Sequence, residues 1–376
     1  MVDNEILFSR GSIVVERSAY PKPDVLEMLS STVWGTPGGT LFRHLDTRDT
    51  LPQMYDPVFI TLRKLGVVNG ILSFSRRKMN LDDIDSAAYY IKHLCFAENW
   101  RPLSNKHKKN SDKDMSALKS TGLMRNLMQN IFKNQACIGE ATNRELPAFF
   151  YAYVEPGNVR SLQMSTSFGF IPVRELSTIA FSRFNPRKSE KVSRAESSEK
   201  ANIISNVQHF YSDHSLFFDS YIYQHNNYFV LRHEGKIVAG VQAGIFHWQV
   251  AELPGISGKI ILNWMPHIPW ISRLFNPADW RFAAFEAFFY KEGHENALPI
   301  LFESVLATLQ VHAALIWMDK RSRWHSTLQT KMNLGMLNKI KSDVPVNLMT
   351  LPVNISSNAI EIIKNQPAYV SAFDLS

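Results

Sequence analysis

Apolar and polar residues alternate in two pairs of runs, one pair in each half of the chain. The runs are Val58 to Leu65, Val67 to Phe74, Tyr228 to Arg232 and Ile237 to Trp248. Short turns containing Gly66 and Gly235 separate the members of each pair. Alternation on both sides of a glycine turn is typical of a β-hairpin. The sequence therefore predicts one hairpin in each half.

The elements expected after each hairpin come in one order: strand, helix, strand and helix. In the first half they are strand 87–96, helix 120–134, strand 148–154 and a helix opened by Asn158; in the second half they are strand 281–290, helix 297–311, strand 313–318 and helix 324–334. Apolar residues at helical spacing mark the helices, and similar spacing at 22–34 and 47–53 precedes the first hairpin. The shared order indicates an internal repeat. We expect an α/β (α+β) chain with a mixed, mainly antiparallel sheet flanked by helices in each half.

Residues 184–200, FNPRKSEKVSRAESSEK, interrupt the apolar pattern near the middle of the chain. Lys, Arg, Glu and Ser replace almost every apolar residue there, so the segment offers little surface to a core. This break predicts a first domain at 1–183, a charged linker at 184–200 and a second domain at 201–376.

The composition is that of an ordinary globular protein. Of the 376 residues, 45% are hydrophobic and 20% are charged, and this length suits two domains of roughly 100–200 residues each. Cys95 and Cys137 are too few for a disulfide framework or a structural zinc site, which favours a reducing, cytoplasmic location. The N-terminus does not resemble a signal peptide, and no apolar run reaches the roughly 18 residues of a membrane span.

The net charge of +7 indicates an anionic partner. Basic residues are scattered except at 101–119, where no aromatic residue is interleaved to stack on bases, and this disfavours nucleic acid. A polyphosphate ligand accounts for the charge equally well. The oligomeric state stays open, a homodimer included.

Residues 147–170, PAFFYAYVEPGNVRSLQMSTSFGF, combine an apolar strand, a tight turn, a short helix and a closing Gly169-Phe170. This order resembles the end of the acyl-CoA site of GCN5-related N-acetyltransferases, in which one strand separates from its neighbour to admit pantetheine. The resemblance implies cofactor contacts at Asn158 and Ser161. The alternative is structural: Asn is a common helix N-cap, and Gly commonly follows a helix end.

Residues 119–124 lie at the start of the predicted helix 120–134 and look like the pyrophosphate loop of the same family. Backbone N–H groups in a first helical turn lack internal partners and can bind phosphate oxygens. The resemblance implies cofactor contacts at Lys119, Ser120, Thr121, Gly122, Leu123 and Met124. Lys119 replaces the usual Arg or Gln, and Met124 replaces a small residue. The alternative is that Ser120 or Thr121 caps an ordinary helix.

An insertion at 103–118 carries four lysines: Lys106, Lys108, Lys109 and Lys113. It is either a lid whose cations meet the 3′-phosphate of coenzyme A or a solvated loop. In the second half, Gly293 stands where Gly122 stands in the first, but Glu292 and Glu295 surround it. Carboxylates stabilise a helix N-terminus and repel a pyrophosphate. We expect only the first half to bind the cofactor.

Acyl transfer to an amine requires a base and a backbone N–H that holds the oxyanion. The resemblance places this N–H near Phe96 or Ala97. His93 and Glu98, on and just after the same strand, are candidate bases, as is Glu286, which lies in an apolar strand where burial would raise its pKa. The alternative is a structural role for His93, a surface position for Glu98 and a structural ion pair for Glu286.

Many members of the family carry a Tyr seven positions after the helix-opening Asn, where it protonates the leaving thiolate. Ser165 occupies that position here, so the acid is either missing or supplied elsewhere, with Tyr151 and Tyr153 as candidates. The four tryptophans Trp248, Trp264, Trp270 and Trp280 either wall an apolar pocket, form an interdomain contact or belong to the core. The glycine-rich segment 35–39 reads as a turn near the substrate side.

No His-Glu-x-x-His metal motif, Gly-x-Ser-x-Gly elbow or dinucleotide fingerprint occurs in the sequence. The resemblance implies two tandem acetyltransferase-like domains, the second degenerate. It also implies N-acyl transfer from acetyl-CoA or another acyl-CoA to the amine of a small molecule or peptide. The alternative function is a non-catalytic acyl-CoA-binding or regulatory protein.

Overall fold

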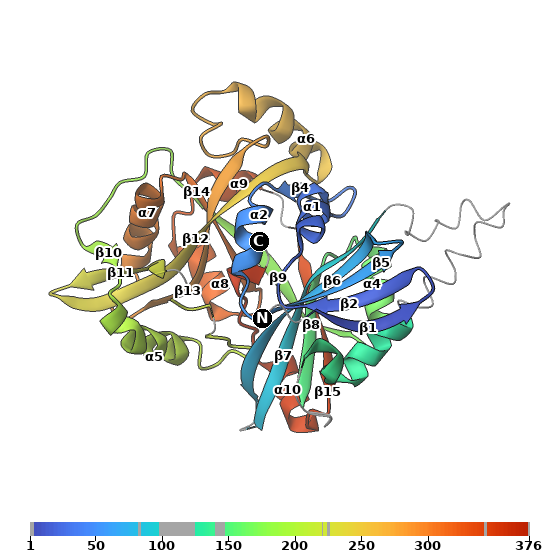
Figure 1. The fold of residues 1–376 in the computed structure, drawn as a ribbon. Coiled ribbons are helices and arrows are strands. Elements are labelled where there is room, and N and C mark those ends of the chain that lie inside the picture. Colours follow the sequence, from blue (N-terminus) through green and yellow to red (C-terminus); the bar gives the residue numbers. More distant parts are fainter. Residues whose placement is uncertain are drawn as a thin grey trace.

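The computed structural model describes residues 4–81, 84–97, 125–139, 147–219, 221–223, 226–341 and 344–374. These residues form a 15-stranded sheet with helices on its faces (Figure 1). The strands are β1 (Glu5–Arg10), β2 (Ile13–Ser18), β3 (Trp34–Gly35), β4 (Leu41–His44), β5 (Pro57–Lys64), β6 (Val67–Leu81), β7 (Ile84–Phe96), β8 (Ala148–Val154), β9 (Ile171–Ser182), β10 (Val192–Arg194), β11 (Tyr228–His233), β12 (Lys236–Glu252), β13 (Trp280–Tyr290), β14 (Ala313–Asp319) and β15 (Val346–Val353).

The α-helices are α1 (Pro23–Ser31), α2 (Thr47–Thr50), α4 (Val159–Ser167), α5 (Lys200–Phe210), α6 (Gly255–Trp264), α7 (Ala297–Leu309), α8 (Arg323–Lys331), α9 (Met336–Ile340) and α10 (Ser357–Asn365). Residues 125–133 are also helical and form the described part of the helix predicted at 120–134. None of the helices in the described ranges is long and apolar enough to cross a membrane.

Both predicted hairpins are confirmed, as β5–β6 and β11–β12. Their turns share one backbone conformation: φ is 51° at Leu65 and 81° at Gly66, and 51° at Glu234 and 73° at Gly235. Positive φ at both central residues matches the right-handed twist of the flanking strands. The same local rule therefore sets the register of the hairpin in each half.

The predicted order of elements after each hairpin is also confirmed. In the first half it appears as β7, the helix at 125–133, β8 and α4, and in the second half as β13, α7, β14 and α8. The charged segment 184–200 has more structure than expected, because its residues 192–194 form β10, which pairs antiparallel with β11 at the edge of the sheet. Short strands at an edge tolerate polar residues since one side stays in solvent.

The two halves exchange their last strands. Strand β15, from the end of the second half, lies between β8 and β9 of the first half and pairs antiparallel with both. Strand β9 in turn pairs with β14 of the second half. The central strands of the sheet have the order β7-β8-β15-β9-β14-β13. From either end the order is the same: two strands of one half, then the last strand of the other half, so the two halves form one continuous sheet. The domain boundaries at 183 and 201 remain a prediction from the sequence.

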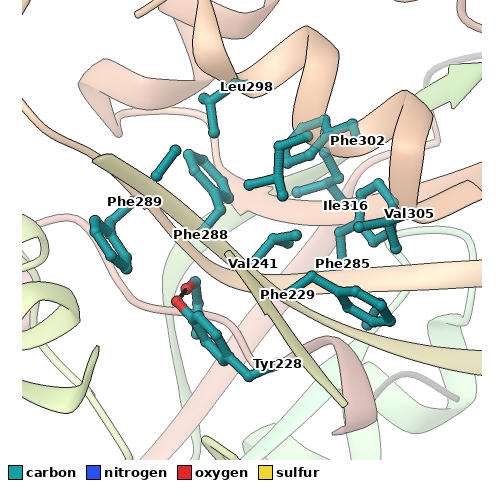
Figure 2. Packing of buried hydrophobic residues seen from close by; sticks show 14 of the residues in the cluster. Tyr228, Phe229, Val241, Phe285, Phe288, Phe289, Leu298, Phe302, Val305 and Ile316 are labelled. Carbon is teal, nitrogen blue, oxygen red and sulfur yellow. Dashed lines mark hydrogen bonds between the residues drawn. The ribbon is translucent and has the colours of Figure 1, made fainter. Parts of the chain in front are cut away.

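The core of the second half packs α7 against the sheet (Figure 2). Phe302 and Val305 of α7 are fully buried, and the Phe302 ring meets the Phe285 ring of β13 at a centroid distance of 4.8 Å. In the first half, Phe132 meets Phe150 of β8 at 5.0 Å. These aromatic pairs supply large buried surfaces that hold helices to strands.

Candidate active site

Strands β7 and β8 run together only at their beginnings. Residues 87–90 pair in parallel with 148–151, and beyond these residues the two strands are no longer paired although β7 continues to Phe96 and β8 to Val154. A gap therefore opens in the sheet after Tyr90 and Tyr151. This is the separation of strands that the sequence resemblance implied.

A β-bulge lies on β7 at the closed end of this gap. Ser73 of β6 is opposite His93, and Phe74 is opposite Ile91, so Lys92 is the extra residue on β7. A bulge redirects side chains and is frequent next to active sites. Here it brings Lys92 to the wall of the cavity described next.

A cavity of about 1020 Å³ occupies the gap and extends toward the second half. Its first-half wall includes Ile91, Lys92, Phe96, Ala152, Tyr153 and Ser161. The predicted glycine-rich turn also lies here, since Gly35, Thr36 and Pro37 line the cavity. Tryptophans enter the wall from β3, β12, β13 and β14. The volume is at the upper end of the roughly 300–1,000 Å³ usual for ligand sites.

The backbone of β7 offers an N–H group at the closed end of the gap. The Ala87 N–H donates to Pro147 O, toward β8. Successive N–H groups along a strand point to opposite sides, so that of Ile91, the first residue beyond the paired segment, is also directed to the β8 side. Ile91 was not among the oxyanion donors suggested by the sequence.

The sequence suggested Ala97 as one possible oxyanion donor. Its N–H is not free for this role, because it donates to Asn69 O at 2.9 Å. By the same alternation, the N–H of Phe96 is turned toward the gap. Phe96 lines the cavity, farther from the closed end than Ile91.

Asn158 caps α4, as the structural interpretation of the sequence expected. Its side-chain oxygen accepts from the Ser161 N–H at 3.0 Å. Gly169, at φ 92°, follows the helix end, and the Phe170 side chain is buried. Asn158, Ser161 and Ser165 line the cavity, so the N-terminal end and one face of α4 border it. The remaining predicted contacts, Lys119, Ser120, Thr121, Gly122, Leu123 and Met124, lie outside the described residues, as does Glu98.

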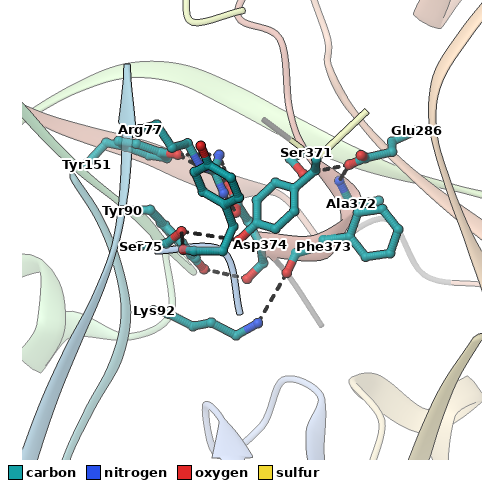
Figure 3. A network of polar contacts seen from close by, with 12 residues as sticks. Ser75, Arg77, Tyr90, Lys92, Tyr151, Glu286, Ser371, Ala372, Phe373 and Asp374 are labelled. Carbon is teal, nitrogen blue, oxygen red and sulfur yellow. Dashed lines mark hydrogen bonds and ion pairs between the residues drawn. The ribbon is translucent and has the colours of Figure 1, made fainter. Parts of the chain in front are cut away.

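A polar network lies beside the gap (Figure 3) and shares Lys92 and Tyr153 with the cavity wall. Asp374, near the end of the chain, forms a fully buried ion pair with Arg77 of β6. Tyr153 donates to an Asp374 carboxylate oxygen at 3.4 Å, and Tyr90 donates to its backbone oxygen at 2.6 Å. Lys92 donates to Phe373 O at 3.1 Å. The C-terminal segment therefore fixes the polar side chains of β6, β7 and β8.

Lys92 and Tyr153 are the titratable side chains that β7 and β8 contribute to the cavity wall within this network. Burial lowers the pKa of Lys92 to about 8. Burial also raises the pKa of Tyr153 well above its usual value, which keeps the hydroxyl protonated. Nothing in the sequence sets Lys92 apart from the other polar residues of this strand, and only the bulge distinguishes it.

His93 is not part of the large cavity. Its side chain is buried, its Nδ1 lies 2.7 Å from Ser73 Oγ, and its ring lies 5.2 Å from the Trp34 ring. It borders a separate void of about 20 Å³. Burial lowers the pKa of His93 well below its usual value, so the imidazole stays neutral.

Glu286 is also outside the large cavity and holds the C-terminal segment. Its carboxylate accepts from Ser371 Oγ at 2.5 Å and from the Ala372 N–H at 2.8 Å. Gln242 donates to its other oxygen at 3.3 Å. Burial raises the pKa of Glu286 to about 7. The carboxyl is thus placed to anchor residues 371–372.

Replacing Glu286 by Gln is expected to make stability less dependent on pH. A folded-state pKa near 7 lies above the unfolded value of about 4.3. The stabilisation from the protonated carboxyl is therefore complete below pH 4 and lost as the pH rises through 7. Urea unfolding should show the wild type losing about 3 kcal/mol more than E286Q between pH 4 and pH 8. Parallel pH profiles for the two proteins would contradict this assignment.

The corresponding gap in the second half is filled by the chain itself. Strands β13 and β14 pair in parallel only at 283–284 and 314–315. Residues Ala368, Tyr369 and Val370 pack there with Glu286, and only about 20 Å³ remains. The expectation that the first half alone binds the cofactor stays a prediction.

The four clustered tryptophans divide between cavity and surface. Trp248 and Trp280 line the cavity, and Trp34 and Trp317 join them from outside the sequence cluster. Trp264 and Trp270 are instead 69% and 55% exposed. Sequence spacing could not separate these two environments.

Comparison with solved structures finds a similar fold in one enzyme, N-myristoyltransferase. N-myristoyltransferase from Saccharomyces cerevisiae with bound myristoyl-CoA aligns over 93% of this chain and 85% of its own, with 9% identity and a TM-score of 0.53. A second structure of that enzyme aligns over 94% of this chain and 82% of its own, with 10% identity and a TM-score of 0.53. The chain shares its fold with an N-acyltransferase. A GCN5-related N-acetyltransferase from Sphaerobacter thermophilus aligns over 87% of this chain and 86% of its own, with 11% identity and a TM-score of 0.41.

No protein-family model matches the sequence, and no curated protein matches it. The likeness is therefore one of structure. With the two matching halves described above, it confirms the predicted fold class.

Proposed function

We propose that this protein transfers an acyl group from acyl-CoA to an amine. The observation that carries the proposal is the gap between β7 and β8, which opens into the large cavity beside the capped N-terminus of α4. Pantetheine is a narrow, amide-bearing chain and can pair with exposed strand backbone. It would place its thioester at the closed end, next to Ile91 and Lys92.

The residues at the closed end can carry out the reaction. The amine nitrogen attacks the thioester carbon, and its proton passes to the neutral Lys92 amine. The Ile91 N–H donates to the oxyanion of the tetrahedral intermediate. The carbon–sulfur bond then breaks, and Lys92 returns the proton to the departing thiolate. This shuttle needs no Tyr at the position of Ser165. Tyr153 is a second proton donor in the same cavity.

The second candidate function is acyl-CoA binding without turnover. It is favoured by Ser165, which lines the cavity where the family commonly has a Tyr. Acetyl-CoA that binds but is not consumed with a broad panel of amines would establish this function instead.

A titration with acetyl-CoA during thermal unfolding tests the donor site. A ligand that binds only the folded state stabilises it by about 2.7 kcal/mol at a concentration one hundred times its Kd, so Tm should rise with concentration. Ala152→Phe places a ring in the gap and should abolish the shift. Ser167→Phe, at an exposed position of α4, should retain it. Absence of any shift in the wild type would refute both candidate functions.

A further inference from the structure

The cavity has an apolar wall that lies beyond the strands that form the gap. This wall, called the second-half wall below, consists of Trp248, Ile261, Trp280, Leu315, Trp317 and Leu337. Its residues come from β12, α6, β13, β14 and α9, all in the second half. The pantetheine of acyl-CoA bound in the gap would contact β7 and β8. The second-half wall would then be left for the acyl group or for the acceptor.

The alternation of side chains along β8 places the second-half wall on one side of the sheet. Phe150, Ala152 and Val154 belong to the apolar cluster of the first half. Tyr153 points to the opposite side and packs against the cluster that contains Trp248, Trp280 and Trp317. Lys92, the proposed base, reaches the polar network on this same side. An amine that gives its proton to Lys92 therefore approaches along the second-half wall.

The aromatic side chains of the second-half wall are packed against one another without a ligand. The Trp248 ring stacks on the Phe42 ring at 4.0 Å and meets Trp280 edge-on at 6.1 Å. Trp280 Nε1 donates to Leu274 O at 3.0 Å, which fixes its orientation. A preformed apolar surface binds an apolar group without the entropy cost of ordering side chains.

We infer that the acceptor is an amine carrying a bulky apolar group, alkyl or aryl, which the second-half wall binds. This inference rests on the proposed acyl transfer and specifies its second substrate. The amine end lies at Lys92 and the apolar group lies among the tryptophans. Affinity should increase about three- to fourfold for each methylene buried.

Calorimetric titration of amines into the CoA-saturated protein tests the inference without requiring turnover. Octylamine should bind more tightly than butylamine, and butylamine more tightly than ethylamine. Equal affinities across the series would overturn the inference. If octanoyl-CoA then bound more tightly than acetyl-CoA, the second-half wall would hold the acyl chain of the donor and not the acceptor.

Two neighbouring residues of α6 supply matched variants. Ile261 faces the cavity, whereas Ile260 is 55% exposed. Ile261→Trp should lower the octylamine-to-ethylamine affinity ratio about tenfold or more, since a filled pocket excludes the longer chain. Ile260→Trp should keep the wild-type ratio. Equal ratios in both variants would place the alkyl chain elsewhere and refute the inference.

The donor and acceptor experiments fail independently. If CoA does not bind, acyl transfer is refuted, and the amine series is repeated on the free protein. If CoA binds but chain length has no effect, only the inference about the acceptor is lost.

Discussion

Replacing Arg77 by Leu is expected to destabilise the protein by about 3–5 kcal/mol. The Arg77 and Asp374 side chains are 0% and 1% exposed. Arg77 also donates to Tyr151 Oη at 2.7 Å. Removing the guanidinium leaves the Asp374 carboxylate buried without its counter-charge, and this costs more than the lost contact itself. Urea unfolding at neutral pH measures the change.

Arg76 provides the matched control on the same strand. It pairs with Asp56 at 2.5 Å, but the two side chains are 26% and 46% exposed. An ion pair in such a setting contributes about 0–1 kcal/mol, so Arg76→Leu should cost little. The double variant Arg77→Leu/Asp374→Leu should recover part of the stability, because neither charge is then stranded. Similar losses for Arg76→Leu and Arg77→Leu would contradict the anchoring role of the buried pair.

The sequence predicted the elements that depend on short-range signals. The turns at Leu65-Gly66 and Glu234-Gly235 require positive φ, and glycine supplies it at low cost. Helix α4 begins after Asn158, whose side chain satisfies an N–H of the first turn. Such information is contained in a few adjacent residues and could be read directly.

The strand exchange could not be predicted in this way. Strand β15 pairs with β8 and β9, which lie far from it along the chain, and its apolar pattern would suit several positions in a sheet. The choice is made by packing against both neighbours and not by local propensity. For the same reason, the sequence could not foresee that residues 368–374 fill the second gap and reach Arg77.

The candidate bases were chosen by residue type, and the structure places them differently. Burial beside Ser73 keeps His93 out of the large cavity, and Glu286 anchors Ser371. Lys92 reaches the wall because the bulge adds one residue to β7. A bulge has no distinctive pattern in this strand, so no sequence signal favours Lys92 over its neighbours.

Replacing Lys92 by Met is expected to lower kcat/KM for acyl transfer by about 10²–10⁴, the usual contribution of a general base. The base acts in its neutral form, and burial lowers the pKa of Lys92 to about 8. In the wild type, kcat/KM should therefore rise tenfold per pH unit below pH 8 and become level above it. An acceptor such as trifluoroethylamine, which is neutral throughout this range, ensures that the titration belongs to the protein.

A purely structural role for Lys92 would leave the pH profile unchanged in shape. Lys92→Met should remove the inflection near pH 8, and Lys92→Arg, which stays protonated, should be equally impaired. Lys78 of β6 is exposed, so Lys78→Met serves as the control and should retain both rate and profile. If Lys92→Met keeps an inflection near pH 8 at a reduced rate, Lys92 positions the C-terminal segment through Phe373 O and another group is the base.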